Sequence, residues 1–121
     1  MILTKTPFRI SFVGGGSDHF NYASPIPGRV ICTTINKFIY VAVNKKHDDK
    51  VRLSYSLTEN VDNAKQLDHL IIRNTLEYFK INKGIEIVTI ADIPSAGSGL
   101  GSSSALTVGL SRALNKLKKK I

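Results

Sequence analysis

Residues 94–105 read PSAGSGLGSSSA, a glycine-rich stretch that separates a compact apolar segment, 85–90, from a helical pattern. Its glycines stand at alternate positions, where they permit positive φ and remove side chains that would keep a ligand away from the backbone. Consecutive N–H groups can then point at phosphate oxygens, and a helix starting near Ser102 adds its unpaired amides and the positive end of its dipole. The stretch therefore predicts a strand, a phosphate-binding loop and a helix, with a triphosphate as the natural ligand.

The serines at the start of this helix bring hydroxyl groups to the same place. Ser102, Ser103 and Ser104 can cap the helix, donate to phosphate or bind a magnesium ion. The alternative is that the glycines form only a tight turn and the serines only a cap. A Walker A loop is disfavoured because no lysine follows the last glycine, and the G-x-G-x-G spacing differs from the dinucleotide-binding G-x-G-x-x-G.

The remaining chain mixes strand and helix patterns. Alternation and β-branched residues predict strands at 8–13, 30–35, 38–43, 51–56 and 85–90. The second and third of these are expected to be adjacent, with Asn36-Lys37 between them as in a hairpin. From about 63 to 80 the apolar spacing becomes helical. The face of this helix is expected to carry Leu67, Leu70, Ile71, Asn74 and Tyr78. No repeat or linker divides the chain, so a single α+β domain is expected.

The charge balance leaves two classes of ligand open. The net charge is +8, but four of the charges belong to Lys116 and residues 118–120, and without them the excess is +4. Such an excess suits a nucleotide at least as well as a polymer, which makes a nucleic-acid-binding module the competing class. The single Cys32 cannot form an intrachain disulfide, and no leader-like or membrane-length apolar stretch occurs. We therefore expect a cytoplasmic protein with no membrane partner.

Two motifs give the chain a resemblance to a known family. The residues Pro94, Ser98, Gly99, Leu100, Gly101, Ser102, Ser103 and Ala105 resemble the ATP-binding loop of the GHMP kinases, which include galactokinase, homoserine kinase and mevalonate kinase. Residues 7–18, PFRISFVGGGSD, are similar to the first motif of that superfamily, and the GGGSD variant resembles the D-glycero-D-manno-heptose 7-phosphate kinase branch. The resemblance covers nearly the whole chain.

The resemblance implies a fold and a chain organisation. The fold is that of a GHMP kinase N-terminal domain, in which a mixed or antiparallel sheet packs against two main helices. In the family a C-terminal α+β domain and an Asp proposed as the base follow the helix after the glycine loop. We therefore expect residues 1–121 to be a truncated N-terminal ATP-binding domain without a second domain, and apolar surface left exposed to favour a homo-oligomer.

The resemblance also implies roles for individual residues. Arg9 would lie near the reacting phosphoryl group, although its strand position also fits a plain surface arginine. A turn would bind the sugar through Asp18, whose alternative role is an Asx turn, and through Gly15, Gly16 and Ser17. Ser103 would bind Mg²⁺, with Ser102 as the second choice. ATP would contact Pro94, Gly97, Ser98, Gly99, Leu100, Gly101, Ser102, Ser103 and Ser104.

The function implied by these roles is ATP-dependent phosphoryl transfer to a hydroxyl of a sugar or sugar phosphate. Such transfer needs a phosphate cradle, Mg²⁺ and an oriented hydroxyl, and each has candidate residues in the sequence. The alternatives are a noncatalytic nucleotide-binding or pseudokinase subunit and, less favoured, a module that binds nucleic acid. The last lacks aromatic residues interleaved with the basic ones.

Overall fold

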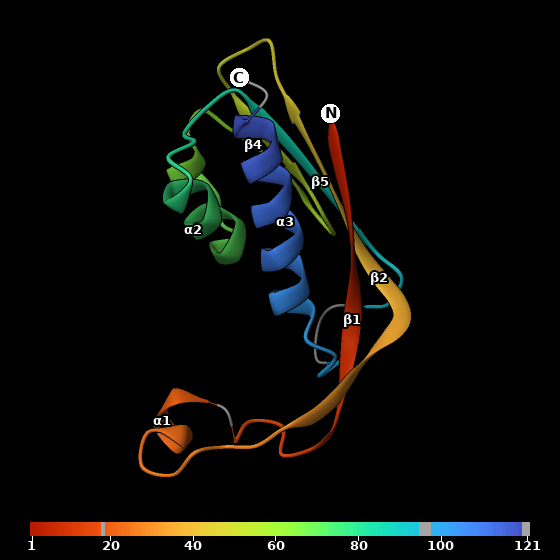
Figure 1. Cartoon of the computed structure of the whole chain (residues 1–121). Helices are drawn as coiled ribbons and strands as arrows, with labels where there is room; N and C mark the ends of the chain where they lie inside the picture. The colour runs from red at the N-terminus through yellow and green to blue at the C-terminus, as the bar shows by residue number, and fades with distance from the viewer. Residues whose placement is uncertain (18, 95–97, 120–121) are drawn as a thin grey trace.

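The architecture is a single mixed β-sheet with helices on one of its faces (Figure 1). The computed structural model describes residues 1–17, 19–94 and 98–119. The strands follow the spatial order β1-β2-β5-β3-β4. They are β1 (Ile2–Val13), β2 (Ile31–Lys45), β3 (Val51–Ser54), β4 (Thr58–Val61) and β5 (Ile85–Ala91). Only the pairing of β3 with β5 is parallel. The expected α+β fold with a mixed sheet is confirmed.

Two main helices cover the sheet, as expected. The helix α3 (Ser102–Lys118) packs against β1 and β2, and α2 (Leu70–Tyr78) packs beside it (Figure 1). A 3-10 turn, η1 (Ala64–Gln66), precedes α2, and a short helix, α1 (Phe20–Ala23), lies at the distant end of the β1–β2 pair. Within the described part of the chain, no helix has the length and apolar character needed to cross a bilayer.

The core forms between the inward side chains of the central strands and one stripe of α3. Val41 and Val43 of β2 and Ile87 of β5 are fully buried, and so are Leu110 and Leu114 of α3. Alternate residues of a strand lie on the same face of the sheet, and helix residues four apart lie on the same side of the helix. The apolar face of the sheet therefore packs against the apolar side of α3 in one layer. Burying each of these side chains stabilises the fold by roughly 1.5 to 3 kcal/mol.

The expected hairpin at residues 36–37 is wrong, because β2 runs as one strand from Ile31 to Lys45. Its pairing with β1 jumps from Pro7↔Phe38 to Arg9↔Thr34, so extra residues of β2 bulge out opposite β1 at this point. A bulge bends a strand and increases its twist. The ends of β1 and β2 leave the body of the sheet here and lead to α1 (Figure 1).

The predicted helical segment 63–80 is interrupted. After η1, Leu67 adopts an extended conformation, and α2 begins only at Leu70. This break changes the phase of the helix, so Ile72, Thr75 and Leu76 are buried whereas Leu70 and Tyr78 are exposed. The helical face expected from the sequence was therefore wrong.

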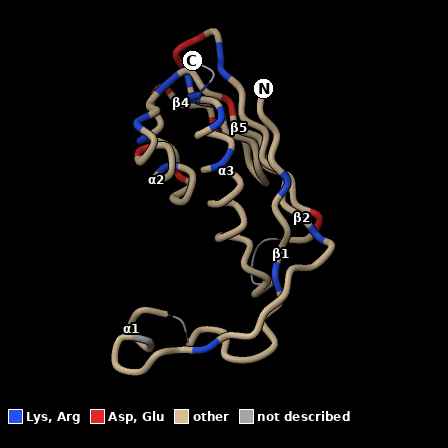
Figure 2. Tube along the Cα trace, in the orientation of Figure 1, with Lys and Arg blue, Asp and Glu red and all other residues tan. Residues whose placement is uncertain are grey.

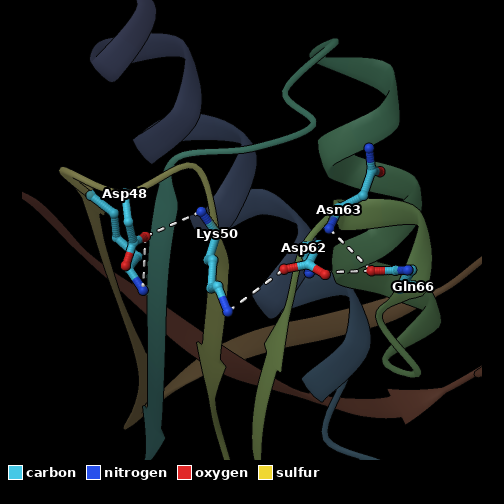
Figure 3. A network of polar contacts seen from close by, with 6 residues as sticks. Asp48, Lys50, Asp62, Asn63 and Gln66 are labelled. Carbon is cyan, nitrogen blue, oxygen red and sulfur yellow. Dashed lines mark hydrogen bonds and ion pairs between the residues drawn. The ribbon is translucent and has the colours of Figure 1, made fainter.

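A network of polar contacts holds the chain at the start of η1 (Figure 3). The backbone N–H groups of Asp62 and Asn63 both donate to Oε1 of Gln66, at 3.2 Å each. Asp62 also lies 3.7 Å from Nζ of Lys50, whose backbone N–H donates to Asp48. Asn63 and Gln66 form a capping box, which satisfies backbone N–H groups at the amino end of η1.

The charged side chains are unevenly distributed along the fold (Figure 2). No Asp or Glu occurs in β1 or α3. None occurs either in residues 8–17, which run from β1 into its glycine turn, or in residues 98–101, which precede α3. The described acidic residues instead lie in β4, α2, β5 and the loops next to β3, β4, α2 and β5. β1 and α3 therefore bring no carboxylate to the glycine loop, and the described carboxylate nearest to the loop in the sequence is that of Asp92, after β5.

The distant end of the β1–β2 pair exposes large apolar side chains. Those more than half exposed are Phe12, Val13, Phe20, Tyr22, Ile26 and Ile31. Solvent-exposed apolar clusters of this kind mark surfaces that associate with other protein. Homo-oligomerisation through such a surface stays a prediction.

Candidate functional site

The amino end of α3 is the centre of the candidate site. Gly99 and Gly101 have φ values of 65° and 71°, in the left-handed region that glycine adopts without strain. Gly101 is the N-cap of α3, and no side chain caps it. The first turn of α3 also contains no acidic residue. The positive end of the helix dipole is therefore not balanced by a carboxylate of its own helix.

Arg9 of β1 lies directly against this helix end. Its backbone N–H donates to the carbonyl oxygen of Leu100 at 3.1 Å, and Nη1 donates to Oγ of Ser11 at 2.6 Å. A Cβ atom added to Gly101 would lie 3.1 Å from Cγ and 3.3 Å from Nε of Arg9. The absence of a side chain at Gly101 is therefore what lets Arg9 approach the helix.

The charge of Arg9 has no counterion in the described part of the chain. The ion pairs there join Lys46 to Asp48, Lys50 to Asp62 and Arg52 to Glu86. A guanidinium at the positive end of a helix is electrostatically unfavourable by itself, because helix amino ends favour negative charge. The arrangement attracts an anion that binds both positive groups.

A cavity of about 640 Å³ opens beside the same helix end. Ser102, Ser103 and Leu106 of α3 form one wall, and the carboxyl end of β5 with the following residues to Pro94 forms another. The remaining lining residues are Ile39, Tyr55, Ser56, His69 and Ile71. The volume lies within the range of about 300 to 1,000 Å³ that is common for small-molecule sites.

The end of the cavity formed by Tyr55 and His69 is polar and aromatic. The two rings meet edge to face with centroids 5.0 Å apart. The pKa of Tyr55 is raised above its usual 10.0, first by desolvation and then by the neighbouring Glu59 carboxylate. Glu59 is held in turn by the backbone N–H of Asp68, which donates to Oε2 at 2.7 Å. The phenol of Tyr55 therefore keeps its proton to higher pH than an ordinary tyrosine does.

Sequence reasoning missed this end of the cavity. Tyr55 follows β3 and His69 precedes α2, and the sheet order brings both to the carboxyl end of β5. No local motif marks either residue.

The glycine turn after β1 forms a compact bend. Gly14 and Gly16 have φ values of 76° and 90°. A Cβ atom on Gly14 would lie 1.9 Å from the carbonyl oxygen of Arg29, so only glycine fits there. The backbone N–H of Ser17 donates to Gly14, and its hydroxyl donates to the same Arg29 oxygen at 3.0 Å. Gly15 lies against Ser11, with its Cβ position 3.4 Å from Cβ of Ser11.

The predicted site residues fall into three places. Arg9 and the turn residues Gly15, Gly16 and Ser17 follow one another along β1 and its end. Pro94, Ser102 and Ser103 line the cavity, whereas Ser98, Gly99, Leu100, Gly101 and Ser104 do not. Asp18 and Gly97 lie outside the described residues. The structure thus brings Arg9 to the glycine loop. Its role near a reacting phosphoryl group stays a prediction.

Ser103, the predicted metal ligand, can supply one of the several oxygen donors that a magnesium ion needs. Among the described residues, no group of three or more His, Cys, Asp or Glu side chains is placed to hold a metal. The hydroxyl-bearing Ser103 lines the cavity at the end of α3. Mg²⁺ commonly keeps several waters and takes phosphate oxygens with one or two protein ligands. Such an ion is compatible with the residues present.

Comparison with known proteins identifies the fold. Residues 66–121 match the family described as GHMP kinases N terminal domain. A solved structure of a D-glycero-D-manno-heptose 1-phosphate kinase from Bacteroides thetaiotaomicron matches 98% of this chain with a TM-score of 0.83 at 24% identity. This chain has the fold of the GHMP kinase N-terminal domain. The resemblance recognised in the sequence is thereby confirmed.

Two further proteins are similar to this chain. A D-glycero-alpha-D-manno-heptose 7-phosphate kinase from Campylobacter jejuni is 32% identical over 93% of this chain. The mevalonate kinase of Methanococcus jannaschii shares the fold over 99% of the chain, with a TM-score of 0.72 and 21% identity. The chain spans 36% of the Campylobacter kinase, 42% of the Bacteroides kinase and 41% of the mevalonate kinase.

Proposed function

We propose that this chain binds ATP as the N-terminal part of a kinase that phosphorylates a hydroxyl of a sugar or sugar phosphate. One observation carries the proposal. Arg9, with no counterion among the described residues, lies against the uncapped amino end of α3. Two positive groups converge there beside a cavity of nucleotide size.

The nucleotide is proposed to lie along this cavity. Its phosphates bind the first-turn amides of α3 and the backbone of the glycine loop, because both present N–H groups to an anion. The base lies toward Tyr55 and His69, between apolar walls that include Ile71 and Leu106. Ser103 is proposed to bind Mg²⁺, which would neutralise charge on the phosphates during transfer.

The acceptor is proposed to bind near the glycine turn at the end of β1. Gly15, Gly16 and Ser17 form the turn just after the strand that carries Arg9, and Ser11, whose hydroxyl accepts from Arg9, lies against Gly15. A ligand at the turn is therefore expected to lie near the guanidinium. There Arg9 offsets the negative charge that grows on the transferred group. The predicted sugar ligand Asp18 follows Ser17 in the sequence and lies outside the described residues. The Campylobacter relative favours a heptose phosphate as the acceptor.

Titration of the purified chain with MgATP by calorimetry tests the proposal. We expect saturable binding that Gly101→Asp abolishes, since a carboxylate at the helix end repels phosphate and its side chain displaces Arg9. A single-stranded oligonucleotide should bind only weakly and in a salt-sensitive manner. Tight oligonucleotide binding without ATP binding would support the nucleic-acid alternative instead.

A phosphotransfer assay separates the kinase from a noncatalytic nucleotide-binding subunit. The full-length protein is supplied with MgATP and a heptose phosphate, and product is followed by release of ADP. Release that depends on the sugar phosphate supports the kinase. Nucleotide binding without any acceptor-dependent ADP release would support the noncatalytic alternative.

A further inference from the structure

Ser11 connects the two halves of the candidate site. Its hydroxyl oxygen accepts the 2.6 Å hydrogen bond from Nη1 of Arg9, and its Cβ lies 3.4 Å from the Cβ position of Gly15 in the glycine turn. Arg9 in turn contacts the Cβ position of Gly101. The four residues form an unbroken series of contacts from the glycine turn to the start of α3.

The Arg9 side chain is constrained from two sides by this series. Its stem lies across Gly101, and its end is held by Ser11. That bond uses one guanidinium N–H, and among the described residues no ion pair takes up the others, so they can serve an anion. A long side chain that is already ordered loses less conformational entropy on binding than a mobile one.

We propose that Ser11 is a positioning residue that holds the Arg9 guanidinium ready for the terminal phosphate of ATP. This inference rests on the proposed nucleotide-binding function, which it deepens by assigning a role to Ser11. Ser11 does not contact the nucleotide itself. It acts through Arg9, and its contact with Gly15 links the placement of the guanidinium to the conformation of the acceptor turn.

The inference predicts an effect confined to the phosphates. Losing one hydrogen bond to a charged group should weaken MgATP binding about fivefold in Ser11→Ala. Adenosine binding should not change, because adenosine has no phosphate for Arg9 to bind. Ser11→Ala should weaken the binding of MgADP less than the binding of MgATP. The dissociation constant of MgADP divided by that of MgATP should therefore fall toward one.

A matched pair of variants separates the hydroxyl from the shape of the side chain. Ser11→Thr keeps the hydroxyl and Ser11→Val replaces it by a methyl group, while both are β-branched and suit a strand. Ser11→Thr should bind MgATP like the unmodified protein, and Ser11→Val should show the same loss as Ser11→Ala. Thermal unfolding of each variant shows whether the fold is retained. If Ser11→Ala does not fold, the comparison of Ser11→Thr with Ser11→Val tests the inference.

A double-mutant cycle with Arg9→Met provides the decisive measurement. If Ser11 acts through Arg9, Ser11→Val should have no further effect on MgATP binding once Arg9 is replaced. An equal loss in both backgrounds would show that Ser11 acts through the fold and would overturn the inference. Unchanged binding by Ser11→Val in the unmodified background would overturn it while leaving the proposed function standing. Failure of the unmodified chain to bind any nucleotide would remove both.

Discussion

The backbone N–H of Arg9 donates a 3.1 Å hydrogen bond to the carbonyl oxygen of Leu100, joining the first strand to the glycine loop. Through this bond the strand that leads to the acceptor turn fixes the loop at the start of α3. The conformation of the loop and the position of the guanidinium are therefore coupled. Changes in the loop should therefore move the Arg9 side chain. Substitutions at Gly99 and Gly101, the two loop glycines with positive φ, test this.

Gly101→Ala should reduce both stability and nucleotide binding. Alanine at φ 71° should lower the free energy of unfolding by about 1 kcal/mol. Its Cβ would also lie 3.1 Å from Cγ of Arg9 and displace the side chain. We expect MgATP to bind about tenfold more weakly as the charge-assisted contact is lost, measured by calorimetry.

Gly99→Ala is the matched control for this prediction. Gly99 has a similar φ of 65°, but nothing lies within 4 Å of its Cβ position. The variant should lose the same stability in thermal unfolding and keep most of its nucleotide affinity. Equal losses of affinity in the two variants would show that loop strain, and not contact with Arg9, controls binding.

Ser103→Ala should weaken the magnesium-dependent part of ATP binding. Ser103 lines the cavity, whereas the neighbouring Ser104 does not, and both residues are exposed. Removing one oxygen donor should reduce MgATP affinity about threefold to tenfold while leaving binding of metal-free ATP nearly unchanged. Ser104→Ala should match the unmodified chain in both titrations. A larger loss in Ser104→Ala than in Ser103→Ala would contradict the assignment.

The strand, glycine loop and helix could be predicted from the sequence because their signals are local. Glycines at positive φ and a helix beginning at Ser102 were both expected, and both are found. The fold class followed from the same signals. The placement of Arg9 beside Gly101 required the resemblance to a known family, because strand alternation alone also fits a surface arginine.

The errors arose where pairing partners decide the structure. The polar Asn36 and Lys37 suggest a turn, but pairing with β1 keeps them in a bulged strand. The strand β4 was missed because Thr58–Val61 is short and polar, and it forms only through pairing with β3. Tertiary context overrides local preference in both cases.

Gly109→Ala should destabilise the fold even though alanine is the better helix former. A Cβ atom on Gly109 would lie 2.8 Å from Oγ1 of Thr6 and 3.3 Å from Oγ1 of Thr4. The helix propensity of alanine contributes about 1 kcal/mol, whereas overpacking costs about 1 to 3 kcal/mol. We expect a net loss of about 1 kcal/mol in chemical unfolding.

The double variant with Thr6→Ala checks the cause of this loss. Removing the Thr6 hydroxyl opens the space that the new methyl group needs. In the Thr6→Ala background, Gly109→Ala should therefore be neutral or stabilising. A persistent loss there would mean that the close approach of α3 to β1 is not what requires glycine.

The stability of the turn before β3 should depend on pH through Asp48. Desolvation raises the pKa of Asp48, but the backbone N–H of Lys50 and the Lys46 ammonium, 3.2 Å away, lower it below 3.8 overall. A depressed pKa gives a stabilising contribution that is present above pH 3.8 and lost as the pH falls through the folded-state value. Asp48→Asn should therefore unfold at lower urea concentration at neutral pH and match the unmodified chain in acid.

Asp49→Asn is the control for Asp48, because the neighbouring Asp49 forms none of the ion pairs found among the described residues. Its urea midpoint should follow that of the unmodified chain at every pH. High salt should leave the backbone hydrogen bond to Asp48 in place and screen the Lys46 pair, so part of the difference should survive.

Tyr55 should make the protein less stable in alkali. Desolvation, followed by the Glu59 carboxylate, raises the pKa of Tyr55 above 10.0, so the folded state keeps the phenol proton longer than the unfolded chain does. The contribution is present below pH 10.0 and is lost as the pH rises through the folded-state value. Tyr55→Phe should remove this loss, as measured by urea unfolding across the alkaline range.

Glu59→Gln separates the two causes in a spectrophotometric titration of the tyrosines. Replacing the carboxylate should move the last phenolate step to lower pH without removing it, because desolvation is the larger cause and remains. Tyr55→Phe should remove that step altogether, whereas Tyr78→Phe, at a residue that is 82% exposed, should leave it. A last step that survives Tyr55→Phe would show that desolvation and Glu59 do not raise the pKa of the Tyr55 phenol.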